Sequence, residues 1–357
     1  MTAASSAAAE PDALPEALGP GEATGLMAQL RGSSAFWIGV VVVGLIIVFG
    51  LITPNNAFIG SRNLFNIGLN ASQIMLIAVG MTFLIGAGHL DLSVGYNVIL
   101  SSVLGAKVMV MVAGSTEQVA AGDYPNLIPA IVAGVVVTIL AASLAGLLNG
   151  MLVTRLRLNS FIVTLATSGI FYGTALILTS ASNVPFVPDQ IQTSFGSYRL
   201  FGQLPLPLVL TLAVCGVMWL VMRTTRFGMR TLAIGSSREA AVRAGIGVER
   251  HTVRLFVLQG LLVGIAAVID LARNAGTNVV GHQSDNLQAI SAVVLGGTSL
   301  FGGIASIGGT LLGSLVPVMM ANGLVIMNVQ PFYQLIVVGL ILLVAVYLDQ
   351  RRRARMS

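Results

Sequence analysis

The sequence has very little charge and almost no cysteine, lysine or histidine. Only 9% of its 357 residues are charged, whereas 55% are hydrophobic, and the mean hydropathy is +0.91. Soluble domains carry about a quarter charged residues, so this composition excludes a water-soluble globular enzyme. The single cysteine, Cys215, leaves no disulfide framework and no cysteine-based metal site. Basic residues gather beside the ends of apolar runs and not in a stripe with aromatic residues, which argues against nucleic-acid binding.

Long apolar runs make up most of the sequence between the few charged residues. Several reach the roughly 20 residues that cross a bilayer as a helix, and their unbroken character favours helices over the short alternating strands of a barrel. We therefore expect an all-α polytopic membrane protein with about ten transmembrane helices. The candidate spans are 36–52, 67–87, 96–113, 127–153, 160–180, 206–222, 254–272, 287–300, 309–327 and 332–348.

The two ends of the chain differ from these runs. Residues 1–33 are rich in Ala, Pro, Ser and Glu and predict a disordered tail, 34–350 read as one membrane domain, and 351–357 form a basic tail. The run 36–52 lacks a small-residue cleavage site after it, so we expect a retained helix. Ten spans place both termini on one side. Arginine is concentrated on that side, which predicts cytoplasmic termini at an inner membrane and outer connections at 114–126 and 181–205.

The segment "GAGHLDLSVG" (86–95) places polar groups at the end of an apolar run. A carboxylate at membrane depth costs at least about 2.5–3.5 kcal/mol, so Asp91 should face a cavity or a partner. Asp91 either caps the next helix or lines a path for a hydrophilic solute, and the two roles are compatible. The candidate pathway residues are His89, Asp91, Ser93, Asn97, Asn149, Gln259 and Ser299. Amides and hydroxyls of this kind join helices more often than they bind solute.

Other spacings predict helix contacts. Asp270 and Arg273, three residues apart near a helix end, predict a local ion pair. Glycine pairs four apart in "GLLNG" (146–150), "GLLVG" (260–264) and "GTLLG" (309–313) predict close helix packing, because small residues let backbones approach in lipid. "GGTSLFGG" (296–303) is a weak echo of "GHLDLSVG" (88–95). Three widely separated histidines supply no catalytic or metal-binding set.

The run 223–253 is polar, basic and expected to be cytoplasmic. Ser236 and Glu239 have the spacing of a capping box, Glu239 and Arg243 are four apart, and Gly245 suits a left-handed helix stop. We expect a helix over 237–244 with a small-residue face of Ala240, Ala241 and Ala244. It lacks the large apolar anchors of a membrane-surface helix, which favours insertion into a protein groove. The candidate residues are Ser237, Arg238, Glu239, Ala240, Ala241, Arg243, Ala244 and Gly245.

This run resembles the coupling loop of permease subunits in bacterial ATP-binding-cassette importers. The chain is more narrowly similar to the ribose/xylose/galactose-type sugar permeases of the branched-chain amino acid and sugar permease superfamily. The resemblance rests on "GHLDLSVG" (88–95), "GLLNGMLVTRLRLNSFIVTLATSGI" (146–170), "REAAVRAGIGVERHTVRLFVLQGLLVGIAAVI" (238–269) and "ISAVVLGGTSLFGGIASIGGTLLGSLV" (290–316). His89 and Leu90 depart from the glycine and isoleucine that are common in the family.

The resemblance implies a permease fold like that of type II importers and a dimer, either of two copies or of paired subunits. It implies a cytoplasmic ATPase subunit docked on the loop around 237–245 and a periplasmic sugar-binding protein as partners. The chain has no "GxxxxGK[ST]" loop, so we expect a non-catalytic subunit that binds no cofactor, with ATP and Mg²⁺ on the partner ATPase. A monosaccharide is the expected solute. A polyol, nucleoside or amino acid permease remains open, as does an ion-coupled transporter.

Overall fold

The computed structural model describes residues 34–330 and, beyond them, 332–334, 336–337, 339–341, 343–344 and 347. The predicted tails, 1–33 and 351–357, lie outside the described residues. The helices are α2 (Ser34–Ile52), α3 (Ser61–Gly86), α4 (Val94–Ala113), α5 (Thr116–Ala120), α6 (Leu127–Arg155), α7 (Ser160–Thr179), α8 (Leu206–Thr224), α9 (Arg226–Ser236), α10 (Arg238–Arg243), α11 (Val248–Asn274), α12 (Asp285–Leu295) and α13 (Ile307–Ile326). The chain also has two short helical turns, η1 (Pro54–Ile59) and η2 (Gln192–Gly196), and a hairpin of β1 (Arg199–Leu200) with β2 (Leu204–Pro205).

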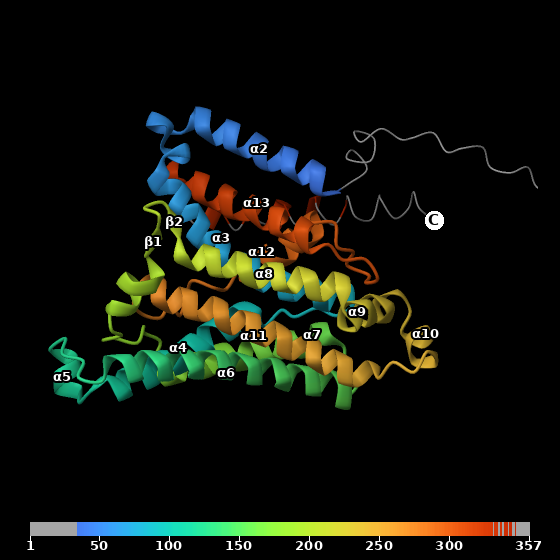
Figure 1. Ribbon diagram of the computed structural model, residues 1–357, viewed down its shortest axis with the longest axis horizontal. Coiled ribbons are helices and arrows are strands. Elements are labelled where there is room, and N and C mark those ends of the chain that lie inside the picture. The colour runs from blue at the N-terminus through green and yellow to red at the C-terminus, as the bar shows by residue number, and fades with distance from the viewer. Residues whose placement is uncertain are drawn as a thin grey trace, which may run out of the picture.

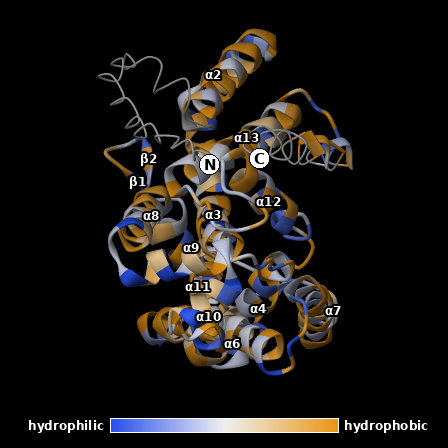
Figure 2. Ribbon diagram, turned by 90° about the vertical axis from the view of Figure 1, so that its right-hand side faces the viewer, coloured by the Kyte–Doolittle hydropathy of each residue, from blue (hydrophilic) through white to orange (hydrophobic). Residues whose placement is uncertain are grey.

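Seven of the described helices are long and apolar enough to cross a membrane: α3, α4, α6, α7, α8, α11 and α13. Each overlaps one predicted span, which confirms a mostly helical, multi-pass membrane protein. Many large hydrophobic residues on the peripheral helices are exposed, and much of α2 and α7 has hydrophobic colouring in Figure 2. Leu51 on α2 is 80% exposed and Ile177 on α7 is 82% exposed. Such surfaces are stable against lipid and not against water.

The predicted span 287–300 is wrong. Helix α12 has 11 residues and is roughly 16 Å long, about half of the hydrocarbon thickness. It stops in a glycine cap, because Gly297 adopts a left-handed conformation (φ +83°). The Gly297 amide donates to Val294 O at 2.9 Å and the Thr298 amide to Val293 O at 3.2 Å. The chain then turns over 296–306 and returns as α13.

Helix α3 lies at the centre of the bundle and is buried along nearly all of its length. It packs against α11, α13, α8 and α12, while α6 runs beside α11 and α4 (Figure 1). Helix α5 and the β1–β2 hairpin lie at one end of the molecule, and α9 and α10 lie at the other (Figure 1). We call these the hairpin end and the α10 end. The predicted outer connections, 114–126 and 181–205, are both at the hairpin end.

The predicted glycine pairs do bring helices together. A side chain at Gly146 would place its Cβ 2.3 Å from Phe256 O, and one at Gly260 would place its Cβ 2.4 Å from Ala142 O, so α6 and α11 touch backbone to backbone. A Cβ at Gly309 would lie 1.9 Å from Gly296 O, where α13 meets the end of α12. The prediction of close packing through small residues is therefore confirmed.

Candidate functional site

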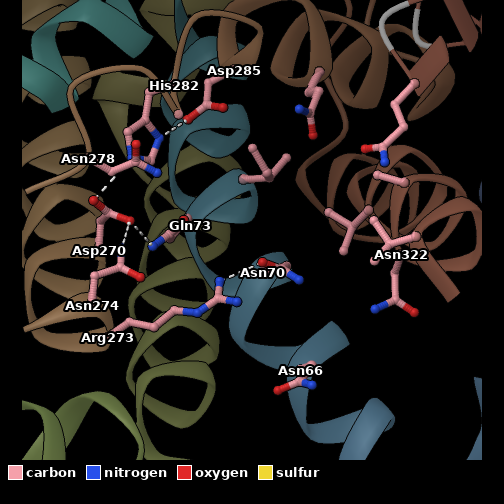
Figure 3. A pocket seen from close by; sticks show the side chains of 17 residues that line it. Asn66, Asn70, Gln73, Asp270, Arg273, Asn274, Asn278, His282, Asp285 and Asn322 are labelled. Carbon is pink, nitrogen blue, oxygen red and sulfur yellow. Dashed lines mark hydrogen bonds and ion pairs between the residues drawn. The ribbon is translucent and has the colours of Figure 1, made fainter. Parts of the chain in front are cut away.

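A polar cavity of about 530 Å³ lies at the hairpin end, among α3, the end of α11, the loop 275–284, α12 and α13 (Figure 3). This volume lies within the range of small-molecule sites. Its polar lining is Asn66, Asn70, Gln73, Asp270, Arg273, Asn274, Asn278, His282, Asp285, Gln288, Asn322 and Gln334, and its apolar lining includes Ile74, Val318 and Val325. The site is thus built mainly of amides beside four charged groups.

The charged groups form one network on the wall made by α11 and α12. Asp270 Oδ1 accepts hydrogen bonds from Gln73 Nε2 at 3.2 Å and from Asn274 Nδ2 at 2.8 Å. His282 lies between two carboxylates, with Nε2 3.1 Å from Asp270 Oδ2 and Nδ1 2.7 Å from Asp285 Oδ2. Burial lowers the pKa of His282. Attraction to Asp285 and hydrogen bonds to both carboxylates outweigh it, and they hold the pKa well above its ordinary 6.5.

Arg273 does not form the predicted ion pair with Asp270. Its Nη1 donates to Asn70 Oδ1 on α3 instead. In the described part of the chain, the ion pairs are those of His282. The physical reason is that the loop 275–284 folds back over the end of α11, which gives Asp270 a histidine partner that the helical spacing alone does not reveal. Arg273 therefore keeps most of its guanidinium N–H groups for the cavity.

The segment 87–93 is a break between α3 and α4, as the sequence predicted. Asp91 Oδ1 accepts from the Ser93 amide at 2.8 Å and from Ser93 Oγ at 2.6 Å, and Asn149 Nδ2 donates to Ser93 Oγ at 2.8 Å. Asp91 is 2% exposed. The carboxylate thus fixes Ser93, the residue that precedes α4, and Ser93 Oγ in turn links this turn to Asn149 on α6. Within the described residues no side chain bonds the amides of the first turn of α4, so Asp91 is not a direct N-cap of that helix.

Hydroxyl groups on α7 bond the backbone of this break. The Leu90 amide donates to Ser160 Oγ at 3.2 Å and the Leu92 amide to Thr164 Oγ1 at 3.0 Å, and Ser168 Oγ donates to Leu92 O at 3.2 Å. The three hydroxyls are one helical turn apart. Irregular backbone within a membrane protein is stable when such neighbours satisfy it.

The other predicted pathway residues lie away from the hairpin-end cavity. Asn97 Nδ2 donates to Ala142 O at 3.2 Å, Gln259 Nε2 donates to Ile77 O at 3.3 Å, and both residues are buried. The Ser299 amide donates to Ile304 O at 3.0 Å within the turn 296–306. None of the seven predicted pathway residues lines the hairpin-end cavity. Among the seven, the structure brings together Asp91, Ser93 and Asn149, and the Asn97 amide donates to Ser93 O at 2.8 Å.

His89 lines a second cavity, of about 480 Å³, at the α10 end. Its Nε2 lies 3.3 Å from Thr252 Oγ1 on α11. The lining is His89, Val153, Thr154, Arg157, Leu158, Arg238, Val248, Glu249 and Thr252. Polar cavities therefore exist at both ends of the bundle, with the break at 87–93 beside the second one.

The predicted coupling loop holds two helices, α9 and α10, and not one. Ser237, and not Ser236, caps α10: its Oγ accepts from the Ala240 amide at 3.2 Å. The expected cap is wrong because Ser236 ends α9 and bonds Leu232 O. In the described chain no ion pair joins Glu239 to Arg243, and Ser237 Oγ lies 3.4 Å from Glu239 Oε2. Gly245 is left-handed (φ +76°), which confirms the predicted stop.

The small-residue face of α10 is divided. Ala241 is buried against the bundle, whereas Ala240, Ala244 and the 54%-exposed Val242 face outward. Helix α10 packs on α9 and α11, with Ala241 as its buried residue, and presents a small apolar patch away from the rest of the chain.

Helix α9 joins this patch to the breaks in the bundle. A Cβ at Gly235 would lie 2.0 Å from Gly86 O and 2.5 Å from the Gly303 amide nitrogen. That amide donates to Gly86 O at 3.0 Å. The end of α9 therefore touches both the end of α3 and the turn 296–306, so a displacement of α9 would act on both segments.

Sequence reasoning missed the hairpin-end cavity, although α3 carries a signal for it. Asn63, Asn66, Asn70 and Gln73 recur at intervals of three and four residues along an otherwise apolar helix. This spacing places them on one face of the helix. The other wall comes from a loop and helix ends, for which the sequence offers no periodic signal.

The chain matches the family described as "Branched-chain amino acid transport system / permease component" over residues 63–346. It is 35% identical to a ribose import permease protein of Bacillus subtilis, covering 92% of this chain and 95% of that protein. It is 35% identical to an L-arabinose ABC transporter permease protein of Azospirillum brasilense, covering 96% and 94%, and 32% identical to a D-allose transport system permease protein of Escherichia coli, covering 88% and 90%. No solved structure matches the chain.

Proposed function

Because the chain belongs to the family of branched-chain amino acid transport system permease components, we propose that it is the membrane subunit of an ATP-binding-cassette importer. Its solute is a monosaccharide, carried across the inner membrane of a bacterium. The observation that carries this proposal is the match, along at least 88% of the chain, to three permeases whose names specify ribose, arabinose and allose. The amide-rich cavity at the hairpin end supports a neutral, hydrogen-bonding solute.

The proposed orientation puts the α10 end in the cytoplasm. Arg155 and Arg157, at and just after the end of α6, and the run from Arg223 to Arg254 belong to this side, as the positive-inside rule favours. The hairpin end then faces the periplasm, where a sugar-binding protein releases solute into the 530 Å³ cavity. Both termini are cytoplasmic in this arrangement. The functional unit is a dimer of two copies with a fold like that of type II importers.

Helix α10 is the proposed docking element for the ATPase subunit. Its outward face of Ala240, Val242 and Ala244 is small and apolar, and a helix of six residues needs a partner to hold it, because short helices are marginal in water. The neighbouring Arg238, Glu239 and Arg243 supply polar rim groups. ATP and Mg²⁺ are bound by the partner and not by this chain.

Motion of the ATPase reaches the solute path through α9. Gly235 touches Gly86 and Gly303, so displacement of α9 acts directly on the two breaks, 87–93 and 296–306. We propose that the predicted pathway residues line or seal the inner half of the path. They are His89, Asp91, Ser93, Asn97, Asn149, Gln259 and Ser299. Opening of that half requires the two breaks to separate from α7 and α9.

Two alanine substitutions, at neighbouring glycines with different backbone conformations, test the docking of α10 on the ATPase. Gly245→Ala places a side chain at φ +76°, which costs roughly 1–2 kcal/mol and shifts α10. Gly247→Ala is the matched control, since its φ is −72° and nothing lies within 4 Å of its Cβ. In proteoliposomes with the ATPase and the binding protein, we expect Gly245→Ala to lose sugar uptake at normal membrane levels, while Gly247→Ala keeps it. Full ATP-driven uptake by Gly245→Ala would contradict the docking role, and absence of ATP-dependent aldose uptake by the wild type would overturn the function.

A further inference from the structure

The charges that line the hairpin-end cavity balance one another. Asp270 and Asp285 are the two carboxylates, and Arg273 and the imidazole between those carboxylates, His282, are the two cationic groups. All four belong to α11, the loop 275–284 and α12. The remaining polar lining is amide. The cavity as a whole therefore offers a solute with a net charge no excess of either sign, and burial of uncompensated charge is costly.

Several lining groups still have hydrogen-bonding capacity. A guanidinium has five N–H groups, and Arg273 donates to Asn70 through Nη1 alone in the described chain. The Asn66 side chain makes no hydrogen bond within the described residues. Asn274 uses Nδ2 on Asp270 and keeps its carbonyl oxygen, and its side chain is exposed to the cavity. These three residues thus offer donors and acceptors from two helices, α3 and α11.

The buried groups behind them are fixed in place. Asp270 is 3% exposed and is held by Gln73, Asn274 and His282. Asp270 Oδ1 accepts from both Gln73 and Asn274, and Oδ2 lies 3.1 Å from His282, so Asp270 acts as a positioning residue that orients Asn274. Figure 3 shows Asp270, Asn274 and Arg273 together on one wall, opposite Asn322. Fixed polar groups of this kind give a site its orientation and specificity.

Apolar side chains complete the lining. Ile74 on α3 and Val318 and Val325 on α13 border the same space as the polar wall. A monosaccharide has a rim of hydroxyls and faces of C–H groups, so it matches a cavity with hydrogen-bonding groups on one side and aliphatic groups on another. The planar guanidinium fork of Arg273 can bond two adjacent hydroxyl oxygens at once.

We propose that the hairpin-end cavity is a binding site of the permease itself for a neutral, polyhydroxylated solute of monosaccharide size, with Arg273, Asn274 and Asn66 contacting its hydroxyls. The permease then selects its solute and does not only admit what a binding protein delivers. This inference rests on the proposed function. It also separates sugars from amino acids, because a zwitterion needs a free cation and a free anion, and the carboxylates here already have their partner in His282.

Equilibrium dialysis of the purified full-length permease in nanodiscs, without ATPase or binding protein, tests the site. The probes are radiolabelled D-ribose, L-arabinose and D-allose, with L-leucine as the zwitterion. We expect at least one aldose to bind and L-leucine not to bind. Arg273→Lys, which keeps the charge but loses the fork, and Asn66→Leu, on another helix, should each weaken aldose binding at least about tenfold.

Gln283→Ala is the control variant. Gln283 is in the same loop as His282, is exposed, donates to the Tyr172 hydroxyl at 3.1 Å and does not line the cavity. It should leave aldose binding unchanged.

Uptake by the complete system separates the two proposals. If ATP-driven aldose uptake proceeds but no aldose binds the permease alone, or both cavity variants bind and transport like the wild type, this site is disproved and the importer function stands. If the complete system takes up no aldose, the function itself fails. If L-leucine binds the wild type and Arg273→Lys weakens that binding, the proposed solute class is wrong.

Discussion

His282 lies 3.1 Å from Asp270 across the loop that joins α11 to α12, measured from Nε2 to Oδ2. Its other ring nitrogen is 2.7 Å from Asp285 Oδ2, so one imidazole ties the end of α11 to the start of α12. His282→Gln should leave two buried carboxylates without their cation. Loss of one partner of a buried pair costs about 3–5 kcal/mol. We expect a markedly lower melting temperature in detergent by intrinsic fluorescence, and a melting temperature equal to the wild type would contradict this bridging role.

The same histidine predicts a dependence of stability on pH. The folded pKa of His282 lies well above 6.5, so above pH 6.5 the folded chain holds a proton that the unfolded chain releases. The stability from this group is therefore fully present below pH about 6.5 and is lost as the pH rises through the folded pKa. Between pH about 6 and 9 the wild type should lose more melting temperature than His282→Gln. Parallel curves for the two proteins would refute the assignment.

Two adjacent serines distinguish the true cap of α10. Ser237 Oγ accepts from the Ala240 amide, whereas Ser236 Oγ bonds Leu232 O inside α9. Ser237→Ala should destabilise α10 by about 1 kcal/mol and weaken capture of the ATPase subunit, because a lost N-cap frays a short helix. Ser236→Ala should have little effect. The measurement is co-purification of the ATPase with each variant, and the reverse order of effects would show that Ser236 is the cap.

Helix contact through glycine predicts a sharp difference between two alanine substitutions. Gly146→Ala forces a Cβ to within 2.3 Å of Phe256 O, so α6 and α11 must separate. Overpacking of this kind costs about 1–3 kcal/mol or more. Gly216→Ala on α8 meets nothing within 4 Å and serves as control. We expect only Gly146→Ala to lower the yield of monodisperse protein in size-exclusion chromatography. Equal yields for the two variants would show that α6 and α11 can move apart at little cost.

Two substitutions of Asp91 distinguish a carboxylate that only accepts hydrogen bonds from Ser93 from one that gains and loses a proton during transport. Its Oδ1 accepts both bonds from Ser93, and an asparagine oxygen can accept the same two. Asp91→Asn should therefore keep uptake within about threefold, whereas Asp91→Leu should lose about 1–3 kcal/mol of stability and most uptake. Abolished uptake in a well-folded Asp91→Asn would instead indicate ion-coupled transport through this carboxylate.

The sequence predicted the helical fold and most of its spans, because a membrane helix needs a run of apolar residues that composition alone reveals. It failed at α12, where 287–300 is apolar enough to suggest a span but Gly297 ends the helix after Leu295. A half-length helix is stable there because α13 packs against it through Gly309 and Gly313. That protection depends on the neighbour and is not visible in the run itself.

The polar groups show the same division. The contact of Asp91 can be predicted from one short segment, since its hydrogen-bonding partner Ser93 is two residues away. For Arg273 the sequence predicts the wrong partner, because helical spacing points to Asp270. In the folded chain the loop supplies His282 to that carboxylate, and α3 supplies Asn70 to the arginine.

The sequence by itself determined that this chain spans a membrane, where its helices approach one another and that the segment 87–93 interrupts them. These properties follow from apolar run length, from missing side chains at glycine and from hydrogen bonds between near neighbours. Only the tertiary structure decided where the polar cavity lies. Its walls come from positions as far apart as Asn66 and Asn322, and such groups meet only after α3, α11, α12 and α13 have packed together.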